Sequence, residues 1–380
     1  MLCGIGVRTW CWSALGVLGL GVRVGCGGGG GSADGLGSNE GFSVPSLRVQ
    51  PSSYLNFKNN GLQPQTLPVF GDARAYGHFS SAERLGLVIA QLTYSPTQAL
   101  AQATPATLSM WEQSSDGAWL DVSSKLSQTT ACIHPRKALT ADFNGDGVAD
   151  VFIACHGYDA GDFPGERSVL LLSDSNRNHQ VSSVLDIGYW HGATAFDVDR
   201  DGDVDLVLLD ARDERRVVTY LNDGTGGFER DVAARFPDVF GGKGYYSIEA
   251  IDVNGNGHED MLVRGHEFDP APTVLMLNPG DGDFSDAEVV TLPPAEGYGV
   301  VLDFTFTSSP ERSLWVLRTG DDPFYQGRAL QRIRLDALSA EMAQASPSGE
   351  WVRWVLPVTT SSGAQIASDR RQDGYVVPYD

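Results

Sequence analysis

Basic residues are scarce in this sequence. Lys and Arg number 27 against 48 Asp and Glu, which gives a formal net charge of −21. This excess of negative charge argues against nucleic acid or an anionic membrane surface as a partner. Helical periodicity is also scarce, whereas 45 Gly and 19 Pro supply abundant turn residues. We therefore expect an all-β chain.

Familiar catalytic signatures are missing as well. The sequence contains no G-x-S-x-G elbow, no H-E-x-x-H pair and no phosphate-cradling Gly-rich loop. These absences disfavour serine hydrolases of the elbow type, zinc proteases of that motif and nucleotide-binding enzymes. No catalytic residue is predicted from motifs alone.

Long apolar runs are lacking too. The run at 10–22 is too short to favour a membrane-spanning helix, and Arg8 is the only charged residue before it, as in a secretory leader. Cys26 follows, and then a flexible Gly/Ser-rich segment. The arrangement resembles a bacterial lipoprotein signal, which implies lipidation of Cys26; plain secretion is the alternative, because Arg23 stands where such signals usually have an apolar residue.

The leader sets the expected domain organisation and location. We predict an exported protein that is either lipid-anchored at the cell envelope or secreted, and that meets a membrane only through its lipid. The expected units are a signal at 1–25, a tether at 26–46 and a single β domain at 47–380.

What the chain does contain is a threefold repeat. Aligned on Asp142, Asp197 and Asp252, three segments read DFNGDGVADVFIA, DVDRDGDVDLVLL and DVNGNGHEDMLVR, at a constant interval of 55 residues. A fixed interval of this size indicates a repeat architecture. Each segment ends in an apolar run with strand character, so its acidic part is expected to form the tip of a β-hairpin.

The acidic parts have the pattern of cation-binding loops. Positions 1, 3, 5 and 9 are always Asp or Asn, and position 6 is always Gly. Oxygen ligands on alternate residues of a tight loop suit Ca²⁺, with the backbone carbonyl of position 7 as a further ligand and Gly for the turn. An EF-hand is excluded, because position 12 is apolar instead of the required Glu. The predicted ligands, for up to three Ca²⁺, are Asp142, Asn144, Asp146, Val148 and Asp150; Asp197, Asp199, Asp201, Asp203 and Asp205; and Asp252, Asn254, Asn256, His258 and Asp260.

These loops resemble those of the FG-GAP/VCBS repeat family, the calcium-loop blades also found in integrin α-subunit heads. The segments LNDGTGGF (221–228) and LNPGDGDF (277–284) add to the resemblance, which is specific across 137–290. The family implies a β-propeller of four-stranded blades. We expect six blades, with seven as the alternative, and a ring closed by strands from both termini, which would hide the edge strands. The N-terminal strands of the closing blade are expected at 53–70, and residues 350–357 are expected to form the outer strand of the fifth blade.

Two cysteines flank the first acidic loop. Cys132 and Cys155 lie where two antiparallel strands would bring them together. A disulfide between them is the prediction for an exported protein, and two separate small buried residues are the alternative.

The face opposite the acidic loops is the expected ligand-binding face. Aromatic and His side chains recur in its loops, and two interpretations remain open: they converge on one ligand site, or they pack between blades and cap turns. The predicted members of the face are His156, Tyr158, Trp190, Tyr245, His266, Phe268 and Tyr298.

The resulting functional prediction is a calcium-binding adhesion or interaction module for a protein or glycan ligand. One alternative is a polysaccharide-active enzyme, a lyase or hydrolase, in which His156 with Asp159, or His266 with Asp269, would form an acid–base pair. The other is a purely structural component of a surface assembly. The oligomeric state is left open by the sequence.

Overall fold

The structure, a computed structural model, describes residues 73–378 except 96–97, 117, 183–184, 213–216, 234, 238–239, 241–243, 268–270, 308–310, 324, 350–354, 361–362 and 369–376. The predicted leader at 1–25, the tether at 26–46 with Cys26, and the strands expected at 53–70 lie outside these residues. Phe268 and Asp269 also lie outside them.

Five antiparallel sheets of four strands follow one another along the chain, each nearly in sequence order. The first contains β1 (Ala73–Gly77), β2 (Gly86–Gln91), β3 (Thr107–Gln113) and β4 (Trp119–Asp121); the second contains β5 (Pro135–Ala141), β6 (Asp150–Cys155), β8 (Val169–Ser173) and β9 (His179–Ser182). The third contains β11 (Trp190–Phe196), β12 (Asp205–Asp210), β13 (Val217–Asn222) and β14 (Phe228–Arg230). The fourth contains β15 (Tyr245–Ile251), β16 (Asp260–Gly265), β17 (Val274–Leu277) and β18 (Glu288–Thr291); the fifth contains β19 (Val300–Thr307), β20 (Ser313–Thr319), β21 (Arg328–Arg334) and β22 (Ser339–Ser346).

The smaller elements complete the described chain. A short ladder pairs β7 (Glu166–Arg167) with β10 (Ile187–Gly188), and a three-stranded sheet contains β23 (Val355–Thr360), β24 (Gly363–Ser368) and β25 (Val377–Pro378). Two 3₁₀ turns lie at Leu100–Gln102 and Ser123–Lys125. No helix among the described residues is long and apolar enough to cross a membrane.

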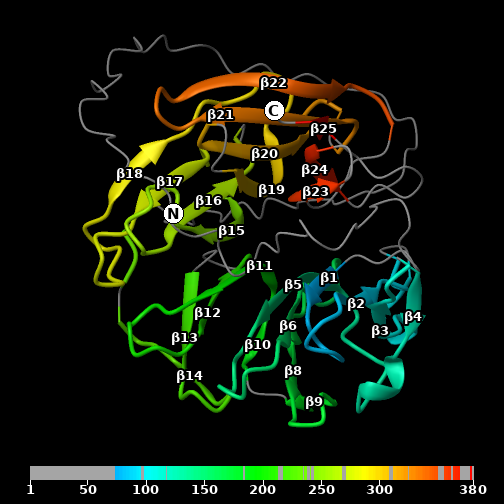
Figure 1. The fold of residues 1–380 in the computed structure, drawn as a ribbon. Coiled ribbons are helices and arrows are strands. Elements are labelled where there is room, and N and C mark those ends of the chain that lie inside the picture. Colours follow the sequence, from blue (N-terminus) through cyan, green and yellow to red (C-terminus); the bar gives the residue numbers. More distant parts are fainter. Residues whose placement is uncertain are drawn as a thin grey trace, which may run out of the picture.

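The sheets are arranged as propeller blades. The first strands β1, β5, β11, β15 and β19 each contact the next first strand, and β19 contacts β23, so these strands surround a common centre (Figure 1). The all-β prediction is therefore confirmed, with five complete four-stranded blades.

The end of the fifth blade differs from expectation. The sequence suggested residues 350–357 as its outer strand, but β22 takes that place and β23 begins the next sheet instead. That sheet has three described strands, all from the C-terminal end of the chain.

The core lies between neighbouring blades, which explains the uninterrupted apolar runs after the acidic loops. In β12, Leu206 and Leu208 pack into the cluster shared with the second blade, whereas Val207 and Leu209 pack into the cluster shared with the fourth. Both faces of this strand are thus buried, and a strand covered on both faces reads as continuously apolar.

Candidate functional site

Each acidic loop connects the first and second strands of its blade, and its side chains accept hydrogen bonds from the loop's own backbone. In the first loop, Asp142 accepts from the N–H groups of Asp146 and Gly147, at 3.1 and 2.8 Å. Asp146 in turn accepts from Val148 at 2.8 Å. The Gly of position 6 has a positive φ in every loop: 80° at Gly147, 102° at Gly202 and 87° at Gly257. That conformation is costly for any other residue, so the Gly is needed for the turn.

The aspartate of position 9 is fully buried and links two segments of its blade. Asp205 accepts from the N–H of Val198 at 2.7 Å and, with its other oxygen, from the N–H of Asn222 at 2.7 Å. It thereby ties the start of its loop to the end of β13. Asp150 and Asp260 make the corresponding bonds in their own blades.

The second loop fits a cation best. One carboxylate oxygen from each of Asp197, Asp199 and Asp205 lies within 4.8 Å of the other two. The Oδ1 atom of Asp199 is buried and accepts no hydrogen bond from the described residues. Burial, with the nearby Asp201, raises the pKa of Asp199. Carboxylates crowded in this way suit Ca²⁺, which Asp197, Asp199 and Asp205 would hold.

At the opposite end of the first strands, three β-bulges direct side chains toward the centre. The pairing register shifts between Pro135 and Lys137 in β5, between Trp190 and Gly192 in β11, and between Tyr245 and Ser247 in β15. A bulged residue is left out of the ladder and its side chain is re-aimed. The residues at the three bulges are Arg136, His191 and Tyr246.

These bulged residues contact one another across blades. His191 Nδ1 lies 2.8 Å from the carbonyl oxygen of Tyr246, and its Nε2 lies 3.3 Å from Arg136. A carbonyl only accepts, so Nδ1 carries the proton and Nε2 accepts from the guanidinium. His191 is therefore neutral, consistent with burial and Arg136 holding its pKa well below 6.5.

A second group of side chains adjoins the bulged residues. His134 and Tyr189 directly precede the first strands at equivalent places, and His156 directly follows β6. The ring of His156 lies 3.7 Å from that of Tyr189, centroid to centroid, and 4.9 Å from that of His191. The Tyr189 hydroxyl donates to Asp159 at 2.5 Å. We call His134, Arg136, His156, Asp159, Tyr189, His191 and Tyr246 the polar mouth.

Opposite pKa shifts mark the two central members of the polar mouth. Burial, helped by His134, His191 and Arg136, holds the pKa of His156 well below its usual 6.5. Burial and the neighbouring Asp159 raise the pKa of Tyr189 well above 10. At neutral pH a neutral imidazole therefore faces a protonated phenol, and His156 Nε2 is buried without a hydrogen-bond partner among the described residues.

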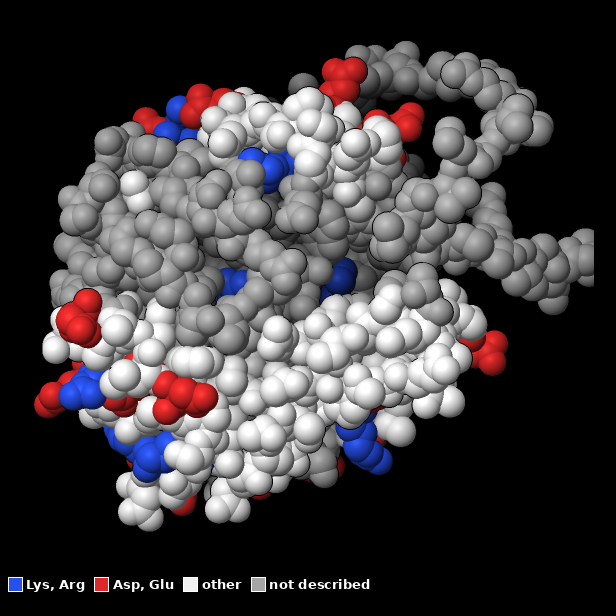
Figure 2. Space-filling view, turned by 90° about the vertical axis from the view of Figure 1, so that its right-hand side faces the viewer, with Lys and Arg blue, Asp and Glu red and all other residues white. Residues whose placement is uncertain are grey.

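Arginines supply positive charge at the same place. Arg264, 4% exposed, lies close enough to Arg136 for their charges to interact, and burial lowers its pKa. Tyr325 adjoins both guanidiniums and shares a hydrogen bond with Arg136. A buried cation such as Arg264 gains from pairing with an anion. The described surface in Figure 2, seen from the side of the first blade, is mostly uncharged, and most of its Asp, Glu, Lys and Arg residues lie toward the edges of the view.

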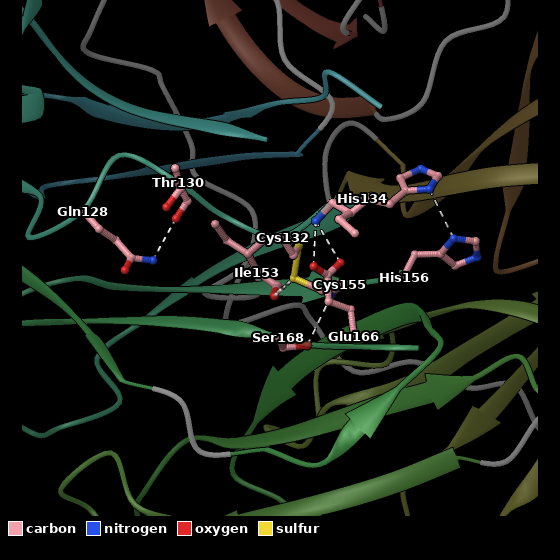
Figure 3. Close-up of a disulfide and its surroundings, with 10 residues drawn as sticks. Gln128, Thr130, Cys132, His134, Ile153, Cys155, His156, Glu166 and Ser168 are labelled. Carbon is pink, nitrogen blue, oxygen red and sulfur yellow. Dashed lines mark hydrogen bonds between the residues drawn. A yellow bond between two sulfur atoms is a disulfide. The ribbon is translucent and has the colours of Figure 1, made fainter. Parts of the chain in front are cut away.

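A disulfide anchors the two histidines of the second blade. Cys132 and Cys155 are bonded to each other, and each is within two residues of a mouth histidine, His134 or His156 (Figure 3). The pairing that the sequence suggested is thus present in the structure. Glu166 fixes the same segment by accepting from the backbone of Ile133 at 2.8 Å.

The predicted ligand-binding face is only partly brought together. His156 and His266 lie in or beside the polar mouth, and the ring of His266 is 4.4 Å from that of Tyr246. Tyr158 packs against Tyr94 at the border of the polar mouth. Tyr298 is partly exposed, and its carbonyl accepts from Arg318 at 3.2 Å.

Trp190 and Tyr245 belong to the core instead. They occupy equivalent places in β11 and β15, but they are 2% and 0% exposed and pack between blades against Tyr220 and Phe240. The bulge is the reason, because it turns the first residue of the strand inward between blades and the next residue toward the centre.

Comparison with known proteins adds one family. Residues 197–263, which include the second and third acidic loops, match the model of the FG-GAP-like repeat. This part of the propeller is an FG-GAP-like repeat. No curated protein matches the chain. Among solved structures, one titled as a polysaccharide lyase of family PL25, an ulvan lyase, matches at 12% identity over 79% of this chain and 76% of its own, with a TM-score of 0.38. Similarity this low supports no statement about activity.

The FG-GAP-like motif locates the acidic loops but not the polar mouth. Arg136, His191 and Tyr246 all stand six residues before the first Asp of their loops, and this spacing is visible in the sequence. The predicted ligand-binding face instead contains Trp190 and Tyr245, which stand seven residues before the first Asp of their loops.

Proposed function

We propose that the protein is a polysaccharide lyase that cleaves uronate-containing chains by β-elimination. The observation that carries the proposal is the pairing of neutral His156 with protonated Tyr189, rings 3.7 Å apart, beside Arg136 and the buried Arg264. Acid and base roles belong to neighbouring groups whose pKa values are driven apart. Cations beside them suit a substrate whose reacting carbon bears a carboxylate.

The roles follow from the protonation states. His156 Nε2 takes the proton from the carbon next to the carboxylate, and the electrons of that C–H bond form the new C=C double bond. The bond to the glycosidic oxygen breaks, and Tyr189 gives that oxygen its phenolic proton. Arg136 and Arg264 stabilise the negative charge that develops on the carboxylate in between.

Hydrolysis fits the polar mouth less well. Most glycoside hydrolases use two carboxyl groups, one as acid and one as base or nucleophile. Around Tyr189, the described contacts supply imidazole, guanidinium and one carboxylate, that of Asp159, which accepts a hydrogen bond from the phenol.

The second candidate is the adhesion or interaction module. The same cationic, aromatic mouth would hold an acidic glycan without cleaving it, and Tyr158 and His266 at its border would add contact area. In that case His156 and Tyr189 would contribute to affinity alone.

Calcium, export and ring closure complete the proposal. Ca²⁺ in the three acidic loops would neutralise their carboxylates and stiffen the hairpins away from the mouth. The sixth blade would combine β23–β25 with a strand from the N-terminal segment. Export, with or without a lipid on Cys26, would bring the protein to extracellular polysaccharide, where a disulfide is stable.

The test is an elimination assay. Purified protein is incubated with alginate, polygalacturonate, glucuronan and sulfated uronate polysaccharides, and the unsaturated product is followed by its ultraviolet absorbance. We expect absorbance to grow with at least one substrate, and kcat to fall about 10²–10⁴-fold in Tyr189→Phe. Tyr220→Phe, which removes a hydroxyl between blades, is the matched control. Calcium-independent binding without any unsaturated product would favour the interaction module, and equal activity in both variants would refute the assigned roles.

A further inference from the structure

We propose that His134, His156 and Asp159 form a binding site for a borderline divalent metal ion such as Zn²⁺. The site is separate from the acidic loops, whose oxygen ligands suit Ca²⁺, because it combines two imidazoles with one carboxylate. Imidazole nitrogen and carboxylate oxygen are common Zn²⁺ ligands.

The distances between the three side chains carry the proposal. The Nδ1 atoms of His134 and His156 are 3.3 Å apart, and their rings are nearly perpendicular at 79° (Figure 3). In a tetrahedral site with Zn–N bonds of about 2.0–2.1 Å, two nitrogen ligands stand about 3.3–3.4 Å apart. The distance between the two nitrogen atoms therefore already equals the edge length of such a tetrahedron.

Asp159 supplies the third ligand. One of its carboxylate oxygens lies within 4.8 Å of a nitrogen on each imidazole. It lies in the loop between β6 and β7 and is only partly buried. The proposed site requires this oxygen to move to bonding distance. The fourth position would be taken by water, as in zinc sites with three protein ligands.

The surroundings hold the two imidazoles in place. The Cys132–Cys155 disulfide joins the segments that carry them, and Glu166 fixes the backbone of Ile133 next to His134. A metal site needs such support, because ligands that must be ordered on binding lose affinity.

Binding at Nδ1 has a chemical consequence for the other nitrogen. An imidazole that coordinates a metal through Nδ1 carries its proton on Nε2, so His156 could no longer accept a proton there. Zn²⁺ would therefore inhibit the lyase; this consequence rests on the proposed function, whereas the binding itself does not.

The experiment measures metal binding without any polysaccharide. Free thiols of the full chain are first alkylated, which leaves the disulfide intact, and metal is removed by chelation. Zn²⁺ binding is then followed by calorimetry, and Co²⁺ binding by its visible absorption, which reports tetrahedral coordination. Excess Ca²⁺ is present throughout to occupy the acidic loops.

We expect one Zn²⁺ per chain and a tetrahedral Co²⁺ spectrum. His134→Ala and Asp159→Asn should each weaken binding at least about 10-fold, whereas His78→Ala, an exposed histidine outside the mouth, should not. Asp159→Asn keeps the shape of the loop, so it remains informative if His134→Ala fails to fold. Unchanged affinity in both mouth variants, or no binding by the wild type, would overturn the site. Elimination activity that survives saturating Zn²⁺ would instead count against His156 as the base, so the two failures are distinguishable.

Discussion

At the scale of single residues, the aspartate of position 9 has a role that does not depend on a cation. Asp205 joins Val198 and Asn222 through two backbone hydrogen bonds of 2.7 Å, and Asp150 and Asp260 repeat the arrangement. A buried N–H left without an acceptor costs about 1–3 kcal/mol. The residue is therefore needed for the hairpin even without metal.

Two substitutions of Asp205 separate these roles. Asp205→Ala leaves both N–H groups without an acceptor. Asp205→Asn keeps one acceptor oxygen but removes the negative charge; burial raises the pKa of the Asp205 carboxyl group to about 6. We expect Ala to lower the free energy of unfolding by about 2–5 kcal/mol and Asn to lower it less. Urea unfolding in EDTA is the measurement, with the exposed Asp286→Ala as control. A loss that appears only in Ca²⁺ would mean that Asp205 acts purely as a ligand.

The pH dependence of elimination reports on His156. Its pKa is held well below 6.5 by burial and by His134, His191 and Arg136, so its basic form persists as the pH falls below 6.5. We expect kcat/KM to stay level from pH 7.5 to 6.5 and to fall only at lower pH, as His156 becomes protonated. An acid limb centred at or above pH 6.5 would contradict this assignment of the base.

At the scale of elements, the bulge explains what the sequence predicted and what it missed. Local sequence pattern predicts the acidic loops, the strands after them and the order of the blades, because an apolar run that follows a Gly turn readily forms a buried strand. The polar mouth does not follow from local pattern. Simple alternation along β11 gives the wrong side-chain directions for Trp190 and His191, because the bulge adds a residue to this strand. Convergence of His156 with Tyr189 depends on packing between segments and has no local signature.

Trp190 provides the test at this scale. Its side chain is 2% exposed and fills the space between the second and third blades. We expect Trp190→Ala to lower the free energy of unfolding by about 3–5 kcal/mol, because a buried aromatic leaves a cavity. Trp190→Phe should lose less and keep its affinity for polysaccharide. If Trp190→Phe keeps its stability but loses affinity for polysaccharide, Trp190 would have to be assigned to the ligand-binding face after all.

At the scale of the molecule, charge is divided between two ends of the propeller. The acidic loops lie at one end of the first strands, and the polar mouth, with Arg136 and Arg264, lies at the other. A net charge of −21 would repel an acidic polysaccharide at long range, so the cations of the mouth must act locally. Three bound Ca²⁺ would offset six of those charges and reduce the repulsion without touching the mouth.

Calcium should therefore raise both stability and activity, by different routes. At a Ca²⁺ concentration of about 100 times Kd, each filled loop adds about 2.7 kcal/mol to the free energy of unfolding. Melting temperature in Ca²⁺ and in EDTA measures this, with Mg²⁺ at equal ionic strength as the control for screening. Asp199→Asn removes the charge of the predicted ligand whose buried Oδ1 has no hydrogen-bond partner among the described residues, so it should abolish a share of the calcium effect. A melting temperature that is the same in Ca²⁺, Mg²⁺ and EDTA would refute calcium binding, whereas equal gains from Ca²⁺ and Mg²⁺ would attribute the effect to screening of the acidic end.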